Sequence, residues 1–189
     1  MKASSFSLLI CILVLTVPGR GHAQEGTFYI APLLDVTWLR IDNNYLLPNF
    51  DDSENIYGPM AKAGYRGASH FVIEVGAGYS ENLTAFGSTF DNYELSRAQV
   101  AVGYTIGADD WFRIEPKIGI NRWRLHAEEG IFFNPGPEDH LTTKGTDVYT
   151  EVNLQMMFND LVGMDLAWIY SSTDFGNARS FRVGVRFEF

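Results

Sequence analysis

The sequence predicts an all-β protein: an eight-stranded antiparallel up-and-down transmembrane β-barrel over residues 24–189. Three observations support this prediction. Hydrophobic and polar residues alternate with a period of two along most of the chain, which is typical of β-strands. The polar face of these strands carries balanced charge and the strand glycines. The apolar face carries aromatic side chains near both strand ends, as expected at two membrane interfaces.

Residues 1–23 are expected to form a signal peptide that is cleaved after Ala23. Lys2 provides a positive start, residues 6–17 form an apolar stretch, and residues 21–23 have the small-residue pattern of a cleavage site. The apolar stretch is too short to span a bilayer comfortably. It contains Cys11, the only cysteine of the chain, so we expect the exported protein to be stabilised without disulfides.

Seven segments alternate clearly and an eighth, at residues 57–66, alternates weakly. The expected strands, in chain order, are 28–38, 57–66, 70–79, 99–106, 112–120, 147–158, 162–170 and 181–189. We expect short turns at 67–69, 107–110 and 159–161, and longer loops at 41–56, 81–92, 125–145 and 171–178. Short and long connections alternate, which is the rhythm of an up-and-down barrel with all long loops at one end.

The polar face is expected to line the lumen and the apolar face to meet lipid. Seven acidic and seven basic residues lie on the polar face, in a chain of net charge -9: Asp35, Glu74, Glu115, Asp147, Glu151, Asp165, Glu188, Lys62, Arg66, Arg97, Arg113, Lys117, Arg182 and Arg186. Buried charges must be paired, whereas a solvated face needs no such balance. The alternative is a secreted barrel of the lipocalin type, whose apolar face surrounds a ligand.

The ending Phe-Arg-Val-Gly-Val-Arg-Phe-Glu-Phe, residues 181–189, resembles the last strand of bacterial outer-membrane barrels. With its eight expected strands and charged lumen, the chain is similar to the OmpA transmembrane domain and to OmpX-like small barrels. The resemblance implies the outer membrane of a Gram-negative bacterium, with both termini in the periplasm and the long loops outside. It also implies that the barrel assembly machinery recognises the terminal Phe189. Because the chain stops there, we expect no peptidoglycan-binding domain of the OmpA kind.

Eight strands leave a lumen just wide enough for side chains to fill it. We therefore expect crossed ion pairs to lock the interior and to form a plug, with a gated narrow channel as the alternative. The expected members are Glu74, Glu115, Glu151, Arg113, Lys117, Arg182 and Arg186.

Four arginines have outward parity at the outer strand ends: Arg40, Arg122, Arg124 and Arg179. Arginine pairs bidentately with phosphate, so we expect this rim to bind lipopolysaccharide phosphates; ordinary snorkelling or loop salt bridges are the alternative. The expected loops are acidic, with Asp42, Asp51, Asp52, Glu54, Glu128, Glu129, Glu138 and Asp139. They show no EF-hand-like spacing, so we expect neither a metal nor another cofactor.

Catalysis is not expected. Small outer-membrane barrels of similar architecture act on lipid A with His and Ser at the outer rim, and His126 and Ser96 are the candidates here. A turn at 107–110 places Ser96 opposite Asn121, five residues from His126. At ~3.3 Å per residue, this separation is roughly 16 Å.

These patterns together predict a monomeric, non-enzymatic outer-membrane barrel that serves envelope integrity or surface interaction through acidic loops. Its expected partners are outer-membrane lipid, lipopolysaccharide and the assembly machinery. The acidic balance without a basic run argues against nucleic acid. A lipid A-modifying enzyme and a secreted carrier of apolar ligands are the alternatives.

Overall fold

A computed structural model describes residues 26–41, 53–82, 91–109, 111–129, 140–173 and 176–189. These residues form antiparallel strands: β1 (Thr27–Ile41), β2 (Ser53–Arg66), β3 (Phe71–Glu81), β4 (Asp91–Tyr104), β5 (Ile106–Asp109), β6 (Phe112–Glu129), β7 (His140–Met157), β8 (Val162–Thr173) and β9 (Gly176–Glu188). Among the described residues, no helix is long and apolar enough to cross a membrane.

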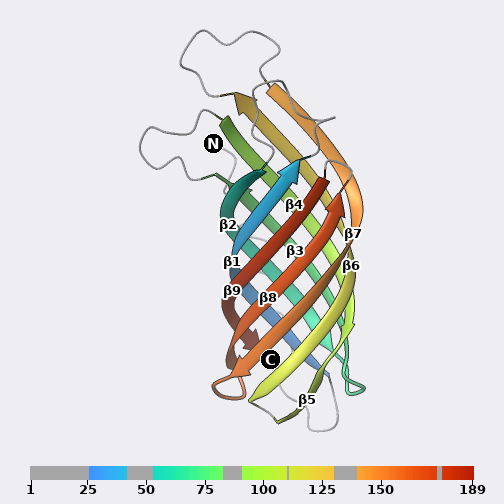
Figure 1. The fold of residues 1–189 in the computed structure, drawn as a ribbon. Helices are drawn as coiled ribbons and strands as arrows, with labels where there is room; N and C mark the ends of the chain where they lie inside the picture. Colours follow the sequence, from blue (N-terminus) through green and yellow to red (C-terminus); the bar gives the residue numbers. More distant parts are fainter. Residues whose placement is uncertain (1–25, 42–52, 83–90, 110, 130–139, 174–175) are drawn as a thin grey trace.

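The strands close into a barrel (Figure 1). Strands that follow one another in the chain pair with each other, except β4 and β5, which both pair with β6; β1 pairs with β9 and closes the barrel. The elements β4 and β5 form one barrel strand that is interrupted at Thr105, since both pair with β6. The prediction of an eight-stranded antiparallel up-and-down barrel is therefore confirmed. We call the end that carries β5 and the carboxyl terminus the lower barrel, and the end where β6 stops and β7 starts the upper barrel.

In the lower barrel the apolar residues point outward, as the alternation predicts. Along β3, Ile73 and Val75 are 47% and 52% exposed, whereas Glu74 between them is 1% exposed. Glycines lie on the inner face where space is short: a Cβ at Gly64 would come within 2.4 Å of the Tyr29 ring, and one at Gly119 within 2.6 Å of the Tyr149 ring. The large rings of the directly paired strands thus occupy the space above these glycines.

In the upper barrel the alternation is reversed. The inward residues of β1, β4 and β6 are apolar and buried, among them Leu39, Leu95 and Leu125. The outward residues at the same level are polar, such as the exposed Arg124 and Lys144. This stretch has the polarity of a water-soluble barrel, with an apolar interior and a polar surface.

The reversal explains why the expected loop boundaries are wrong. We expected loops at 41–56, 81–92, 125–145 and 171–178, but strands continue through Ile41, Glu81, Glu129 and Thr173 and restart at Ser53, Asp91, His140 and Gly176. The expected strands end where the outer face becomes polar, because their alternation was defined by apolar residues on that face. The chain nevertheless stays extended, because the inner face offers an apolar core to pack against.

The expected turn at 107–110 is also misplaced. Strand β5 carries the chain on to Asp109, so the turn follows that residue. Ile106 pairs with Ile114, and the register shifts by one residue before Asp109 pairs with Phe112. The later turn and the register shift together displace every partner on β6 that the expected turn assigned to residues of β4.

Aromatic side chains gather on the outer face near both ends of the lipid-facing zone. The Phe28 and Tyr65 rings are 4.7 Å apart near the lower end, and those of Trp38 and Trp168 are 5.8 Å apart higher up. All four side chains are exposed. The first pair joins the neighbouring strands β1 and β2, and the second joins β1 and β8 across β9. Both pairs lie at the depths where amphipathic rings prefer to lie in a bilayer.

Candidate functional site

The lumen contains a continuous ion-pair network. Its members are seven cationic and six anionic residues: Lys62, Arg66, Arg97, Arg113, Lys117, Arg182, Arg186, Asp35, Glu74, Glu115, Glu151, Asp165 and Glu188. All seven residues that we singled out from the sequence lie in it. The other six share the same inward parity.

At the base of the network, Glu188 lies between two arginines. Its carboxylate accepts hydrogen bonds from Arg66 Nη2 and Arg113 Nη1, each at 2.9 Å. One level higher, Arg186 binds Asp165 bidentately, with Nε–Oδ1 at 2.9 Å and Nη2–Oδ2 at 3.1 Å. The Arg186 guanidinium also lies 3.7 Å from the centre of the Tyr29 ring, which adds a cation–π contact.

The centre of the network is a set of two lysines and two glutamates. Lys117 Nζ is 2.6 Å from Glu74 and 3.3 Å from Glu151, and Lys62 Nζ is 3.2 Å from Glu74 and 2.5 Å from Glu151. The Tyr29 hydroxyl donates a further hydrogen bond of 2.6 Å to Glu74. These side chains are almost completely buried, so each charge depends on its partners to offset desolvation.

At the top of the network, Asp35 holds two arginines. Arg182 Nε donates to its Oδ1 at 2.7 Å, and Arg97 pairs with its Oδ2. Thr37 donates a hydrogen bond of 2.6 Å to the same carboxylate. Arg97 also donates to Ser180 at 3.1 Å. Because Arg182 reaches Glu151 as well, at 3.4 Å, the top and the centre are connected.

An apolar cluster lies above the network inside the barrel. We call it the apolar cap; its members are Leu39, Ile56, Tyr93, Leu95, Trp123, Leu125, Ala127 and Ala178. They come from β1, β2, β4, β6 and β9, so the cluster draws on strands from around the barrel. Sequence analysis missed this cap, although an apolar residue at every second position of 123–127 was the signal that could have revealed it.

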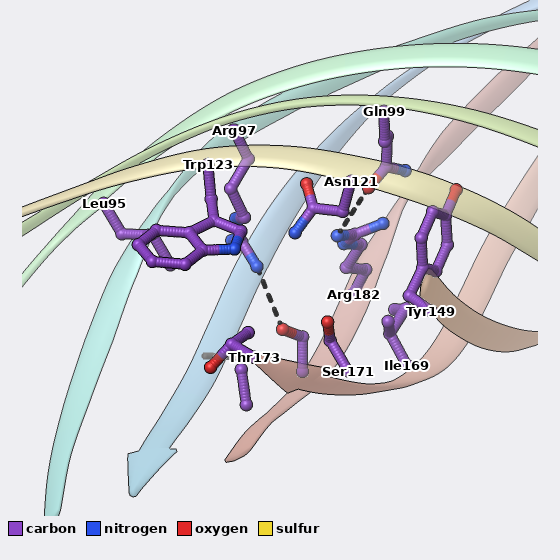
Figure 2. Close-up of a pocket in the computed structure, with 12 residues that line it drawn as sticks. Leu95, Arg97, Gln99, Asn121, Trp123, Tyr149, Ile169, Ser171, Thr173 and Arg182 are labelled. Carbon is purple, nitrogen blue, oxygen red and sulfur yellow. Dashed lines mark hydrogen bonds between the residues drawn. The ribbon is translucent and has the colours of Figure 1, made fainter. Parts of the chain in front are cut away.

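A cavity of about 10 Å³ lies between the apolar cap and the ion-pair network (Figure 2). Five buried polar atoms of its lining have no hydrogen-bond partner among the described residues: Arg97 Nε, Gln99 Nε2, Asn121 Oδ1, Tyr149 OH and Ser171 Oγ. Measured as space for the centre of a water molecule, this is close to the roughly 10–15 Å³ that one water requires. The cavity is therefore at the lower limit of the space that one water needs.

The four rim arginines lie on the outer face but not together. Arg40 and Arg179 belong to β1 and β9, which are neighbours, and Arg122 and Arg124 belong to β6 on the far side of the barrel. All four are exposed, and none forms an ion pair with a residue that the structure describes. The four arginines therefore form two separate patches.

Ser96 and His126 lie closer together than the roughly 16 Å that the sequence predicts. Ser96 lies opposite Arg124, and His126 lies opposite Glu94. Ser96 and His126 are thus diagonal neighbours, at about 7–8 Å between Cα atoms, because the turn lies later than expected. His126 Nδ1 lies 2.7 Å from the Thr142 hydroxyl, and no hydrogen bond joins it to Ser96. A nucleophile–base pair needs such a contact.

Of the remaining predictions, the one for Phe189 concerns a residue that the structure describes, whereas those for the signal peptide and most loop residues do not. Phe189 forms two backbone hydrogen bonds with Phe28, of 2.8 and 3.3 Å, so it joins the last strand to the first. The expected signal peptide and the loop residues Asp42, Asp51, Asp52, Glu138 and Asp139 lie outside the described residues. Within the described part of the chain, no group of three or more His, Cys, Asp or Glu residues could hold a metal ion.

Comparisons with known proteins give a consistent result. The family model of the outer membrane protein beta-barrel domain matches residues 7–189. Among solved structures, the chain is similar to Ail, the attachment invasion locus protein of Yersinia pestis, with 12% identity, a TM-score of 0.64, and coverage of 87% of this chain and 99% of that chain.

Two further structures are similar over the same share of this chain. Ail of Yersinia pestis in complex with the heparin analogue sucrose octasulfate has 14% identity, a TM-score of 0.61, and 87% and 99% coverage of this chain and that chain. Neisserial surface protein A has 14% identity, a TM-score of 0.63, and 87% and 100% coverage. No curated protein matches the chain. At such identities the structural likeness shows the fold.

Proposed function

Because the chain belongs to the outer membrane protein β-barrel family and is an outer-membrane protein, we propose that it is a closed, non-enzymatic barrel that acts through its outer surface. The single observation that carries this proposal is the filled lumen. Arg182, Arg186 and Lys62 are at most 1% exposed, although each carries a charge. A water-filled pore would leave such side chains hydrated.

The lumen is closed by two plugs of different chemistry. The ion-pair network fills the lower and middle levels with charged side chains that contact one another. Above it, the apolar cap consists mainly of hydrocarbon and ring surface, so a passing ion would have to lose most of its hydration shell there. An outer-membrane location also excludes the secreted carrier, and the charged lower lumen is unsuited to apolar ligands.

The outer surface is the working part in this proposal. The two arginine patches, Arg40 with Arg179 and Arg122 with Arg124, engage phosphate groups of lipopolysaccharide, since the guanidinium binds phosphate bidentately. The similar protein Ail has been seen in complex with the heparin analogue sucrose octasulfate, a polyanion, which supports anion binding by a barrel of this architecture. The acidic loops serve surface interaction or envelope integrity.

The two ends of the chain have roles in export and in assembly of the barrel. Residues 1–23 direct export and are removed after Ala23, and the terminal Phe189 is recognised by the barrel assembly machinery. The side chain of Phe189 is 43% exposed even though its backbone pairs with β1, so a receptor could reach the ring before and during closure. The barrel works as a monomer.

Cysteine accessibility tests the closed lumen. Residues 24–189 contain no cysteine, so Ser180→Cys introduces a single thiol beside Arg97 inside the barrel. We expect it to resist a water-soluble methanethiosulfonate reagent until the protein is unfolded. Ser69→Cys, in the exposed turn after β2, is the matched control and should react at once. Equal rates for the two folded variants would contradict a closed lumen.

Lipopolysaccharide retention by the refolded protein tests the arginine patches. We expect Arg40→Gln with Arg179→Gln, and Arg122→Gln with Arg124→Gln, each to lower retention and its dependence on salt. The control is Thr146→Ala with Ser172→Ala, two exposed outward residues that carry no charge. Unchanged retention by both arginine variants would refute the patches.

A further inference from the structure

The outer face of the upper barrel carries an asymmetric arrangement of charge on β3, β4, β6 and β7. We call it the acid–base patch and define it by Glu81, Glu94, Ser96, Arg124, His126 and Lys144. The two acidic residues lie on β3 and β4, and the two permanent cations lie on β6 and β7. The acidic half and the basic half therefore lie side by side on neighbouring strands.

Each half contains like charges directly opposite one another. Glu81 pairs in register with Glu94, and Arg124 pairs with Lys144. Like charges at facing positions of a sheet repel each other. Arg124 and Lys144 are exposed, and neither forms an ion pair with a residue that the structure describes. On the acidic side, Glu81 accepts a hydrogen bond of 3.1 Å from the Tyr79 hydroxyl. An external group of opposite sign therefore offsets the repulsion that remains within each half.

A groove of about 250 Å³ runs between the two halves. It is lined by Glu94 and Ser96 on one side and by Arg124 and His126 on the other. The register pairs Glu94 with His126 and Ser96 with Arg124, so the groove follows the β4–β6 contact. Its volume is slightly below that of pockets for drug-sized ligands, which suits a small polar headgroup.

From these observations we propose that the acid–base patch binds a lipid headgroup that carries both a phosphate and a primary amine, of the phosphoethanolamine type. Arg124 and Lys144 bind the phosphate, and Ser96 donates a hydrogen bond to it. Glu94 accepts N–H bonds from the ammonium group, with Glu81 adding negative charge nearby. The patch lies above the lipid-facing apolar zone, where headgroups are found. The proposal refines the Arg122–Arg124 part of the proposed function and rests on it.

The other arginine patch lacks this feature. Arg40 and Arg179 have Asn177 and Trp38 as cross-strand partners, respectively. No carboxylate is opposite either of them in the β1–β9 pairing. A phosphate alone satisfies that site, so it provides an internal control for selectivity.

Lipid retention by the folded full-length protein tests the proposal. Protein in mild detergent is mixed with equal amounts of phosphatidylethanolamine, phosphatidylglycerol and phosphatidylcholine, and the retained lipid is measured by native mass spectrometry. We expect phosphatidylethanolamine to be retained about tenfold over phosphatidylglycerol, which has the phosphate without the amine; one charge-assisted contact gives a ratio of this order. Phosphatidylcholine should be disfavoured because its quaternary amine has no N–H donor.

Two substitutions separate the halves of the site. Glu94→Gln should bring the ratio of phosphatidylethanolamine to phosphatidylglycerol close to one, while Arg124→Gln should weaken retention of both lipids. Ser172→Ala, an exposed uncharged position on β8 outside both arginine patches, is the matched control and should leave the ratio unchanged. A wild-type ratio of one, or a ratio that Glu94→Gln does not alter, would overturn the proposal. If lipopolysaccharide is still retained in that case, only this inference fails; if it is also lost, the proposed phosphate role fails with it.

Discussion

The lower and upper barrel are built by the same strands with opposite polarity. In the lower barrel, apolar residues face outward and charged residues face inward; in the upper barrel, the inward residues are the apolar cap and the outward residues are polar. One β-barrel can therefore be matched to two solvents along its axis. Lipid requires an apolar exterior, whereas water and headgroups require a polar one.

The two interiors are also held by different forces. In the ion-pair network, each buried charge relies on particular partners, so removing one partner leaves another charge unpaired. In the apolar cap, each side chain contributes by burial and dispersion, and neighbours compensate in part when it shrinks. Substitutions in the two regions should therefore differ in size and in how they combine.

The largest effect is expected from Asp35→Asn. This change removes the shared partner of Arg97 and Arg182 and should lower the free energy of unfolding by about 3–5 kcal/mol. Urea unfolding in lipid vesicles measures it. The matched control is Asp160→Asn in the exposed turn before β8, which should stay within about 0.5 kcal/mol of the wild type. A similar loss in both variants would show that the network does not depend on pairing.

A double-mutant cycle tests the same difference between the ion-pair network and the apolar cap. Arg97→Met combined with Asp35→Asn should be less destabilising than the sum of the two changes, with a coupling energy of about 0.5–3 kcal/mol, because the two residues are direct partners. Arg113→Met combined with Leu125→Ala joins one residue from each region at opposite ends of β6. These two should be additive within about 0.5 kcal/mol. Equal coupling in both cycles would argue against separate regions.

A smaller effect is expected in the apolar cap. Ile56 is completely buried there, so Ile56→Val should lower the free energy of unfolding by about 0.5–1.5 kcal/mol. Ile118→Val is the matched change on the lipid-facing surface, where Ile118 is 53% exposed. Since lipid fills the space of the lost methylene, the control should change stability by less than about 0.5 kcal/mol. The reverse order would contradict an apolar interior in the upper barrel.

The smallest effect is expected at the boundary. Ser171 lines the cavity, and its hydroxyl has no partner among the described residues. Ser171→Ala should stay within about 0.5 kcal/mol of the wild type in the same unfolding assay, since no hydrogen bond between side chains is lost. A loss of about 2 kcal/mol or more would mean that this hydroxyl anchors a structural water.

The lower barrel could be predicted from the sequence almost completely. Alternation alone placed Glu74, Lys117 and Arg186 on the inner face, and their contacts follow from the small width of an eight-stranded lumen. Which residues pair could not be predicted, because Asp35 and Arg97 meet only when the barrel closes. A one-dimensional pattern carries no information about partners on facing strands.

The upper barrel was mostly missed, for a physical reason. Sequence analysis fixed the phase of each strand by requiring apolar residues outside, and residues such as Trp123 and Leu125 obey the opposite rule. The expected separation of Ser96 and His126 was wrong for a different reason: the turn lies beyond Asp109 and the register shifts within β5. Register depends on turn position, so an error of a few residues there moves every cross-strand neighbour.

The most direct test of the central claim, a lumen closed by two successive plugs, is the electrical current through single proteins in a planar bilayer. Insertion of folded protein is checked by the heat-dependent shift of the unboiled sample in a denaturing gel. We predict no steady conductance above that of the bare bilayer for the folded protein. A stable open current of reproducible size would contradict the account, because it would require a continuous aqueous path through both the ion-pair network and the apolar cap.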